Sequence, residues 1–383
     1  MPDSPPRPVW VASKRDLSTV VDRLAAEPAL AVDTESNSLF AYRERICLIQ
    51  FSTRTADYLI DPLALKDLSP LDALLADPRI EKIFHACEYD LICLRRDYGF
   101  RVVNVFDTMI AARTLGWPKM GLATILEGLW GLKTNKRYQR ADWSRRPLSP
   151  EQLLYACLDT RHLLPLRDLL YDELKSGDRL EEAREEFERL TQVNGATAIF
   201  DPEGFWRING ARDLAPREAA ILRELYLYRE KVAERADKPP FKVIGEDTLI
   251  AIARRQPREA KDLQGLPGMS EGQIKRHQQG LLKAVQRGLA TTTPRPPQHG
   301  RSDEATLARY EALRTWRKKK AQSRGVESDV IVPRDALWAI AQANPKTADD
   351  LTGIGELGPW RRDKYGEEMM TVLAVLNGVS GNH

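Results

Sequence analysis

Short apolar runs alternate with helical periods over the first 175 residues of the chain. The apolar runs have the length of β-strands and lie at 29–34, 46–52, 57–60, 81–86 and 101–106. Apolar residues recur at helical spacing at about 70–76, 88–97, 108–115, 121–130 and 150–174. Three early strands, followed by strands that alternate with helices, predict an α/β domain with a mixed sheet.

The second half of the chain repeats itself. Residues 172–190 combine a helical period with many charges, which predicts a solvated connecting helix. Beyond about residue 205 we expect no strand, and residue n resembles residue n+88 without a gap from Leu225 to Val285. Identical pairs include Leu225/Leu313, Arg229/Arg317, Leu249/Leu337, Ile252/Ile340 and Leu263/Leu351. This register predicts two copies of one helical module.

The predicted domains are an α/β domain at 1–195 and two helical modules at 205–290 and 300–383. The segment "TTTPRPPQHG" (291–300) is rich in proline, which favours an extended, semi-rigid linker between the modules.

Composition adds a compartment and a class of partner. The 383 residues are 42% hydrophobic, and no apolar run is long enough to span a membrane. The N-terminus lacks the pattern of a signal peptide, so we expect a cytoplasmic protein. Four cysteines form no CxxC pair and lie in apolar stretches, which indicates reduced, buried thiols. Residues 205–290 hold 17 basic and 11 acidic residues, which favours an anionic partner.

Candidate chemistry begins at "AVDTES", where Asp33 and Glu35 end an apolar strand. Residues i and i+2 of a strand share a face, so the two carboxylates lie side by side. Asp90 follows about one turn into the helix after the strand that ends near His85. Tyr155 and Asp159 share one helix face, because they are four residues apart.

Four converging carboxylates would raise one another's pKa and destabilise the protein, unless cations neutralise them. Mg²⁺ and Mn²⁺ prefer such oxygen ligands, and two ions can stabilise both the attacking and the leaving oxygen of a phosphoryl displacement. From spacing alone, a second interpretation stays open, in which each carboxylate marks an element that meets solvent.

The order of these residues resembles the three exonuclease motifs of the DEDD superfamily, in its tyrosine branch. "VDTE" is similar to the first motif, His85–Asp90 to the second and Tyr155–Asp159 to the third. The resemblance implies that Asp33 bridges two divalent ions, while Glu35 and Asp159 complete the ion on the nucleophile's side. It places Asp90 at the other ion, largely through water, and Tyr155 against the attacking water. A phenol with a pKa of about 10 is a poor base, so we expect Tyr155 to orient that water.

A closer resemblance is to the ribonuclease D family. The stretch "KRYQRADWSRRPLSPEQLLYACLDT" (136–160) and "VFDTMIAARTLG" (105–116) resemble that family, and "GIGELGPWRRDKYGEEMM" (353–370) is similar to the HRDC module. The resemblance implies a ribonuclease-H-like exonuclease domain with a mixed sheet, followed by two all-α HRDC domains. Local signals agree with it, since Ser149 and Pro150 are suited to begin the helix of the third motif and Asp107 to cap another.

Substrate contacts are expected in two places. Basic and aromatic residues mix between 133 and 146, where Lys136, Gln139 and Trp143 are the candidates for binding single-stranded RNA. For Trp143, core packing and base stacking both stay open. In each repeat a glycine-rich turn precedes a basic helix, and the turn either binds phosphate or only permits a tight connection between helices.

The sequence thus predicts a monomeric, metal-dependent 3′→5′ exoribonuclease. Its substrates would be RNAs with single-stranded 3′ ends, tRNA precursors first, and its products nucleoside 5′-monophosphates; polarity, product and substrate follow from the resemblance. Two alternatives stay open: a DNA 3′→5′ exonuclease and a non-catalytic RNA-binding protein.

Overall fold

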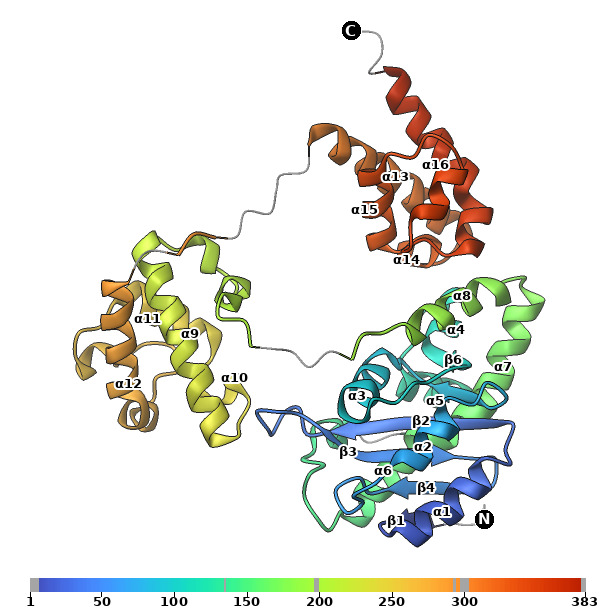
Figure 1. Ribbon diagram of the computed structural model, residues 1–383, viewed down its shortest axis with the longest axis horizontal. Helices are drawn as coiled ribbons and strands as arrows, with labels where there is room; N and C mark the ends of the chain where they lie inside the picture. The colour runs from blue at the N-terminus through green and yellow to red at the C-terminus, as the bar shows by residue number, and fades with distance from the viewer. Residues whose placement is uncertain (1–6, 134–135, 196–199, 292–293, 297–302, 380–383) are drawn as a thin grey trace. The chain divides into compact units, whose positions relative to one another are not determined.

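A six-stranded mixed sheet forms the centre of the N-terminal part of the chain (Figure 1). The computed structural model describes residues 7–133, 136–195, 200–291, 294–296 and 303–379. The strands are β1 (Val9–Val11), β2 (Ala29–Ser36), β3 (Ile46–Ser52), β4 (Asp57–Ile60), β5 (Glu81–Phe84) and β6 (Val105–Asp107). They lie in the order β1-β4-β3-β2-β5-β6; β3 and β4 are antiparallel, whereas β1–β4, β2–β5 and β5–β6 are parallel. The predicted mixed sheet is confirmed.

Helices cover both faces of this sheet. They are α1 (Lys14–Leu24), α2 (Ser69–Leu75), α3 (Glu88–Tyr98), α4 (Thr108–Leu115), α5 (Leu122–Trp130), α6 (Pro150–Arg161), α7 (Leu163–Ser176) and α8 (Leu180–Thr191). Neighbouring residues of a strand face opposite ways, so Val32 packs in one core with α1, α2 and α3. Ala31 packs in the other, with α4, α7 and α8. Helix α6 packs against β3 and β4, and Trp143 belongs to the core between them.

Two short elements at the start of the chain were not predicted. Strand β1 has three residues, two of them exposed, so it shows no alternation that could identify it. Helix α1 does show a helical period, because Leu17, Val20 and Leu24 are buried on one face. Its N-cap is Ser13, whose side chain accepts the Asp16 N–H.

Two predicted elements have different bounds in the structure. The run 101–106 forms a strand only from Val105, since Asn104 has a φ of 51° and breaks the extended backbone. The period at 150–174 is divided into α6 and α7 at His162. Pro165 explains this break, because proline is tolerated in the first turn of a helix and not in its interior.

The prediction of a solvated connecting helix at 172–190 was wrong. Asp178, with a φ of 53°, separates α7 from α8. Helix α8 buries Ala183 and Phe187 against the sheet, together with the carboxylate residue Glu182. The many charged residues of α8 made its amphipathic period hard to recognise in the sequence, and several of these residues form ion pairs.

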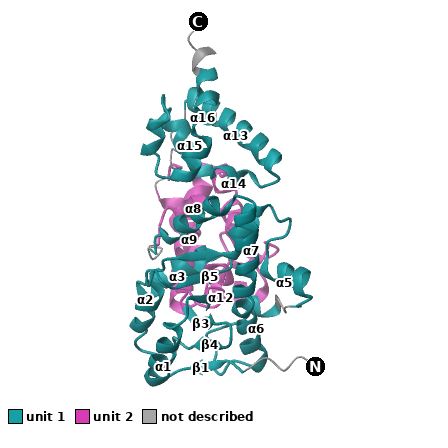
Figure 2. Cartoon of the chain, turned by 90° about the vertical axis from the view of Figure 1, so that its right-hand side faces the viewer, with its two compact units in different colours: residues 1–35, 46–196, 302–383 teal, residues 36–45, 197–301 magenta. Residues whose placement is uncertain are grey.

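The chain divides into two compact units (Figure 2). One unit contains residues 1–35, 46–196 and 302–383, and the other contains residues 36–45 and 197–301. The second unit is helical apart from its loops, with α9 (Pro216–Ala236), α10 (Pro240–Val243), α11 (Glu246–Arg255) and α12 (Glu271–Ala290). In it, residues 36–45 contact α9: the Tyr42 hydroxyl donates to Glu230, and its N–H donates to Asp237.

The two predicted copies of the helical module have equivalent elements. In the second copy these are α13 (Glu304–Arg324), α14 (Ser328–Ile331), α15 (Arg334–Ala343) and α16 (Pro359–Val379). The identical pairs form the two cores, since Leu225, Leu313, Leu249 and Leu337 are all fully buried. One equivalent contact recurs as well: Arg229 donates to the Ile244 carbonyl, and Arg317 donates to the Val332 carbonyl.

Two expectations from composition can be checked in the structure. Cys47, Cys87, Cys93 and Cys157 are all buried and form no disulfide among the described residues, as predicted. Within the residues that the structure describes, no helix has both the length and the apolar character needed to cross a membrane.

Candidate active site

Asp33 and Glu35 lie near the carboxyl end of β2, where the buried run of the strand ends. Asp159 approaches them from α6. Carboxylate oxygens of Asp33, Glu35 and Asp159 all lie within 4.8 Å of one another, so three of the four predicted carboxylates meet at one point.

Helix α6 is built to present Tyr155 and Asp159 on this side. Ser149 accepts the Gln152 N–H, the Gln152 side chain accepts the Ser149 N–H, and Pro150 occupies the first helical position. The predicted start of the helix is therefore confirmed. The Tyr155 hydroxyl interacts with the carboxylate of Asp159, one turn further along the helix.

Asp90 joins the site through Thr34. Its carboxylate accepts the Thr34 N–H at 3.1 Å and the Thr34 hydroxyl at 2.5 Å. This side chain comes from the first turn of α3 and is only 8% exposed. Thr34 separates Asp33 from Glu35 in the sequence, and neighbouring residues of a strand face opposite sides. Thr34 nevertheless belongs to the site, because its backbone N–H and its hydroxyl hold the Asp90 carboxylate.

Burial and mutual repulsion dominate the electrostatics. Burial, reinforced by the neighbouring carboxylates, raises the pKa of Asp33 and Glu35 well above their usual values. Burial also raises the pKa of Asp90 and of Asp159 to about 7. A divalent cation fits such a group, because oxygen ligands surround it and its charge offsets the repulsion.

Asp107 has a larger role than the predicted N-cap of α4. Its buried carboxylate accepts the Met109 and Ile110 N–H groups at the start of α4, as expected. It also accepts the Ala86 and Cys87 N–H groups at 3.2 and 2.7 Å, directly before α3. One side chain thus fixes the helix that carries Asp90. The second contact spans 20 residues and leaves no local signal in the sequence.

We expect Asp107→Ala to cost about 2–4 kcal/mol of unfolding free energy, because it removes the cap of α4 together with both hydrogen bonds to the segment before α3. Urea unfolding would measure this cost. Asp303→Ala is the matched control, since Asp303 accepts the Thr306 N–H at the start of α13 alone. Equal costs for the two variants would contradict the double role.

His85 and Tyr155 have the contacts and protonation states expected of their predicted roles. His85 Nδ1 lies 2.9 Å from the Thr108 hydroxyl, and burial lowers the pKa of the imidazole. Burial and the nearby carboxylates raise the pKa of the Tyr155 phenol, so the hydroxyl keeps its proton at neutral pH. The expected structural role of His85 and orienting role of Tyr155 agree with this geometry.

A cavity of about 490 Å³ opens over the carboxylates. Gln139 lines it, as expected for a substrate contact, and so does the start of α5 at Gly121–Thr124. These four residues were not predicted. A glycine directly before a helix was the available signal, and it is a weak one.

The other predicted substrate residues differ from Gln139. Trp143 is 1% exposed and its ring lies 6.0 Å from that of Tyr155, so the structure favours core packing and contradicts its assignment as a substrate contact. Arg146 in the same stretch forms two hydrogen bonds with Asp61 and is structural. The side chain of Lys136 lies outside the described residues.

Known proteins share this architecture. The family model for 3′-5′ exonucleases matches residues 8–175, and the HRDC domain model matches residues 218–285 and 306–373. Ribonuclease D of Nitrobacter hamburgensis is 31% identical over 374 residues, which cover 96% of this chain and 95% of that protein. The chain belongs to the ribonuclease D family. It is therefore a hydrolase, a 3′→5′ exoribonuclease with HRDC modules.

Two further relatives show how far the similarity extends. The crystal structure of Escherichia coli RNase D, described as an exoribonuclease involved in structured RNA processing, matches with a TM-score of 0.71 and 26% identity over 96% of this chain and 98% of that one. The exosome complex exonuclease RRP6 of Saccharomyces cerevisiae is 31% identical over 325 residues. This chain spans 44% of that longer protein. The ribonuclease D layout thus covers nearly the whole chain.

Proposed function

We propose that this ribonuclease D family member removes 3′-terminal nucleotides from RNA with two divalent ions, Mg²⁺ or Mn²⁺, and releases nucleoside 5′-monophosphates. The observation that supports this most is the meeting of Asp33, Glu35 and Asp159 within 4.8 Å. When bound there, two ions would supply charge stabilisation for the attacking and leaving oxygens of the phosphodiester.

The side chains have distinct tasks in this proposal. Asp33, Glu35 and Asp159 hold the ions, while Asp90 contributes from the far side through its fixed position beside Thr34. The Tyr155 hydroxyl, which interacts with Asp159, orients the attacking water and does not abstract its proton. Trp143 packs beside the Tyr155 ring and restricts its rotation.

The proposed substrates are structured RNAs with a single-stranded 3′ end, tRNA precursors first. The described function of the Escherichia coli relative supports structured RNA, and the basic surplus of residues 205–290 supports contact with phosphates. Gln139 in the cavity wall is the side chain most suited to contact the terminal nucleotide. A cytoplasmic location and a monomeric state stay predictions.

A product analysis would test this function. The full chain is incubated with a 3′-tailed tRNA and with RNA and DNA oligonucleotides of matched sequence, in Mg²⁺, in Mn²⁺ and in a chelator. We expect metal-dependent release of nucleoside 5′-monophosphates from the 3′ end of the RNAs. Equal or faster hydrolysis of DNA would favour the DNA exonuclease. Binding of RNA without hydrolysis in either metal would favour the non-catalytic alternative.

A further inference from the structure

The two helical modules differ where their last long helices begin. In the first module, Ser270 is the N-cap of α12, and its hydroxyl accepts the Gln273 N–H at 3.3 Å. In the second module the corresponding residue, 88 positions later, is Gly358. A glycine has no side chain that can cap a helix, so α16 needs a hydrogen-bond acceptor from elsewhere.

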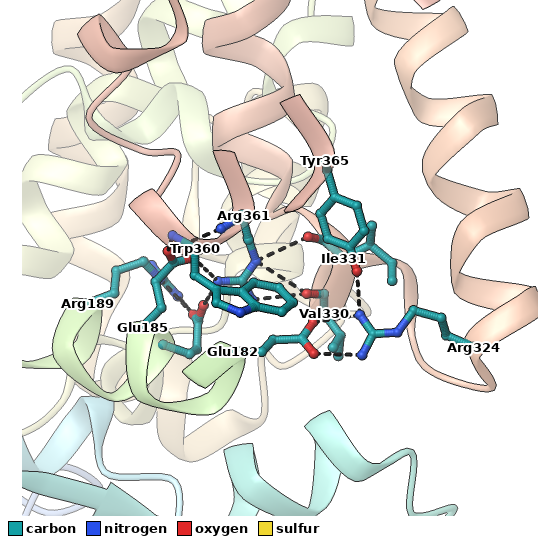
Figure 3. A network of polar contacts seen from close by, with 10 residues as sticks. Glu182, Glu185, Arg189, Arg324, Val330, Ile331, Trp360, Arg361 and Tyr365 are labelled. Carbon is teal, nitrogen blue, oxygen red and sulfur yellow. Dashed lines mark hydrogen bonds and ion pairs between the residues drawn. The ribbon is translucent and has the colours of Figure 1, made fainter. Parts of the chain in front are cut away.

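Helix α8 of the nuclease part supplies this acceptor (Figure 3). The Glu185 carboxylate accepts the Trp360 N–H at 2.5 Å and the Arg361 N–H at 3.3 Å. A negative charge is also favoured at the positive end of the helix dipole. A Cβ atom at Gly358 would lie 2.1 Å from the Glu185 carboxylate carbon, so glycine is what lets the two approach.

The next difference strengthens the same contact. Gln273 of the first module donates to the Val243 carbonyl, and its counterpart Arg361 donates to the equivalent Ile331 carbonyl. Arg361 has a longer, charged side chain and also reaches Glu185 at 2.7 Å. It is 3% exposed, so this ion pair is buried and well shielded from solvent.

A second buried carboxylate of α8 is paired in the same way. The Glu182 side chain is fully buried and accepts two hydrogen bonds from Arg324, at 2.8 and 2.6 Å (Figure 3). Arg324 also donates to the Tyr365 hydroxyl. The counterparts of Arg324 and Tyr365 in the first module are Ala236 and His277, and alanine cannot form such a pair.

Helix α4 adds a third contact. Arg113 pairs with Glu327 at 2.9 Å and with Asp329, both near the start of α14. The corresponding residues of the first module are Pro239 and Phe241, which carry no charge. The charged residues of these three contacts, Arg361, Arg324, Glu327 and Asp329, are therefore specific to the second module.

We propose that the second module is a docking module, fixed to α8 of the nuclease by a helix cap that Glu185 provides. The Glu185 carboxylate thus occupies the helix start that follows the glycine-rich turn, where phosphate binding was one of the two open interpretations. The first module caps its own helix, so phosphate binding at such a turn stays a prediction for the first module alone. The second module thereby covers α8, which in turn packs on β6 and α3.

Cleavage of the intact chain would test the docking. A site for a specific protease is inserted between residues 291 and 303, and the purified full-length protein is cut and analysed by size exclusion at tens of micromolar. We expect the wild-type C-terminal fragment to elute together with residues 1–291. Separate elution of the wild-type fragments would overturn the proposal. The assay does not depend on hydrolysis of RNA, so it is independent of the proposed function.

Two variants separate docking from folding of the module. Glu185→Ala removes the donated cap, whereas Gly358→Ser gives α16 a cap of its own and excludes the Glu185 carboxylate by steric overlap. We expect both to release the fragment, and the fragment from Gly358→Ser to stay helical by circular dichroism. A Gly358→Ser fragment that remains bound would contradict the proposal.

Matched controls come from the same elements. Glu181→Ala removes an exposed carboxylate of α8 that pairs with Arg184 on the same helix, and it should not release the fragment. Ser270→Gly removes the cap of α12 in the first module and should not release it either. Hydrogen exchange of the uncut chain gives a second measurement: the Trp360 and Arg361 amides should be protected in the wild type and lose protection in Glu185→Ala.

Discussion

Asp33→Asn should lower the rate of RNA hydrolysis by at least about 10³-fold, because in the proposed function two ions share this carboxylate, and such a group contributes several kcal/mol of charge stabilisation. A carboxylate oxygen of Asp33 lies within 4.8 Å of carboxylate oxygens of both Glu35 and Asp159, so the loss of its charge weakens the whole cluster. The measurement is single-turnover hydrolysis of a 3′-tailed RNA at saturating Mn²⁺. Asp22→Asn, at an exposed position of α1, is the control and should hydrolyse at the wild-type rate.

The same variant should be more stable than the wild type without metal, and the effect should depend on pH. The pKa of Asp33 is raised in the folded state, so the folded protein holds this proton more tightly than the unfolded chain does. Stability is therefore lost as pH rises from about 4, the ordinary value for aspartate, through the raised value. In a chelator, Asp33→Asn should melt close to the wild type at pH 4 and above it at pH 8. Wild-type-like turnover, or a lower melting temperature at pH 8, would contradict the assignment.

Tyr155→Phe should lower the catalytic rate by about 10²-fold and leave the affinity for RNA nearly unchanged. The variant loses the hydroxyl that interacts with Asp159, and a group that positions the water acts mainly in the transition state. It keeps the ring that packs against Trp143 and Tyr138, so the fold should be intact.

The test of Tyr155 needs rate and affinity from one preparation. Single-turnover rates give the first, and binding to RNA in Ca²⁺ or in a chelator gives the second. Tyr138→Phe serves as the control, because it removes a hydroxyl from a neighbouring ring of the same cluster. A parallel fall in rate and affinity, or no change in either, would indicate that Tyr155 has a packing role.

Local signals were sufficient for the parts of the site that lie within single elements. Two carboxylates two residues apart in a strand, and Tyr155 and Asp159 four residues apart in a helix, share a face by backbone geometry alone. Ser149, Pro150 and Asp107 also indicated where their helices begin, because helix capping involves only residues that are close in the sequence. The core residues of the two modules could also be predicted from the sequence, because identical apolar pairs at a fixed spacing must fill equivalent positions.

Contacts between distant segments could not be predicted. The side chain of Asp107, at the end of β6, reaches Cys87 after the adjacent strand β5, and Trp143 is buried against α6; neither contact leaves a trace in the neighbouring residues. Helix α8 was predicted to be solvated because its glutamates suggested an exposed face. Their partners, Arg324 and Arg361, are more than 140 residues away in the sequence.

The exchange of Ser270 for Gly358 also affects how freely each copy of the module can be moved between proteins. A module whose helices carry their own caps is portable, because its stability does not depend on the neighbours it is given. The first copy meets this condition at α12, whereas the second relies on a carboxylate from outside its own sequence. Chimaeras in which the first copy replaces the second should therefore fold as separate, unattached modules. The reverse replacement should need both Gly358→Ser and Arg361→Gln to restore a self-sufficient helix start.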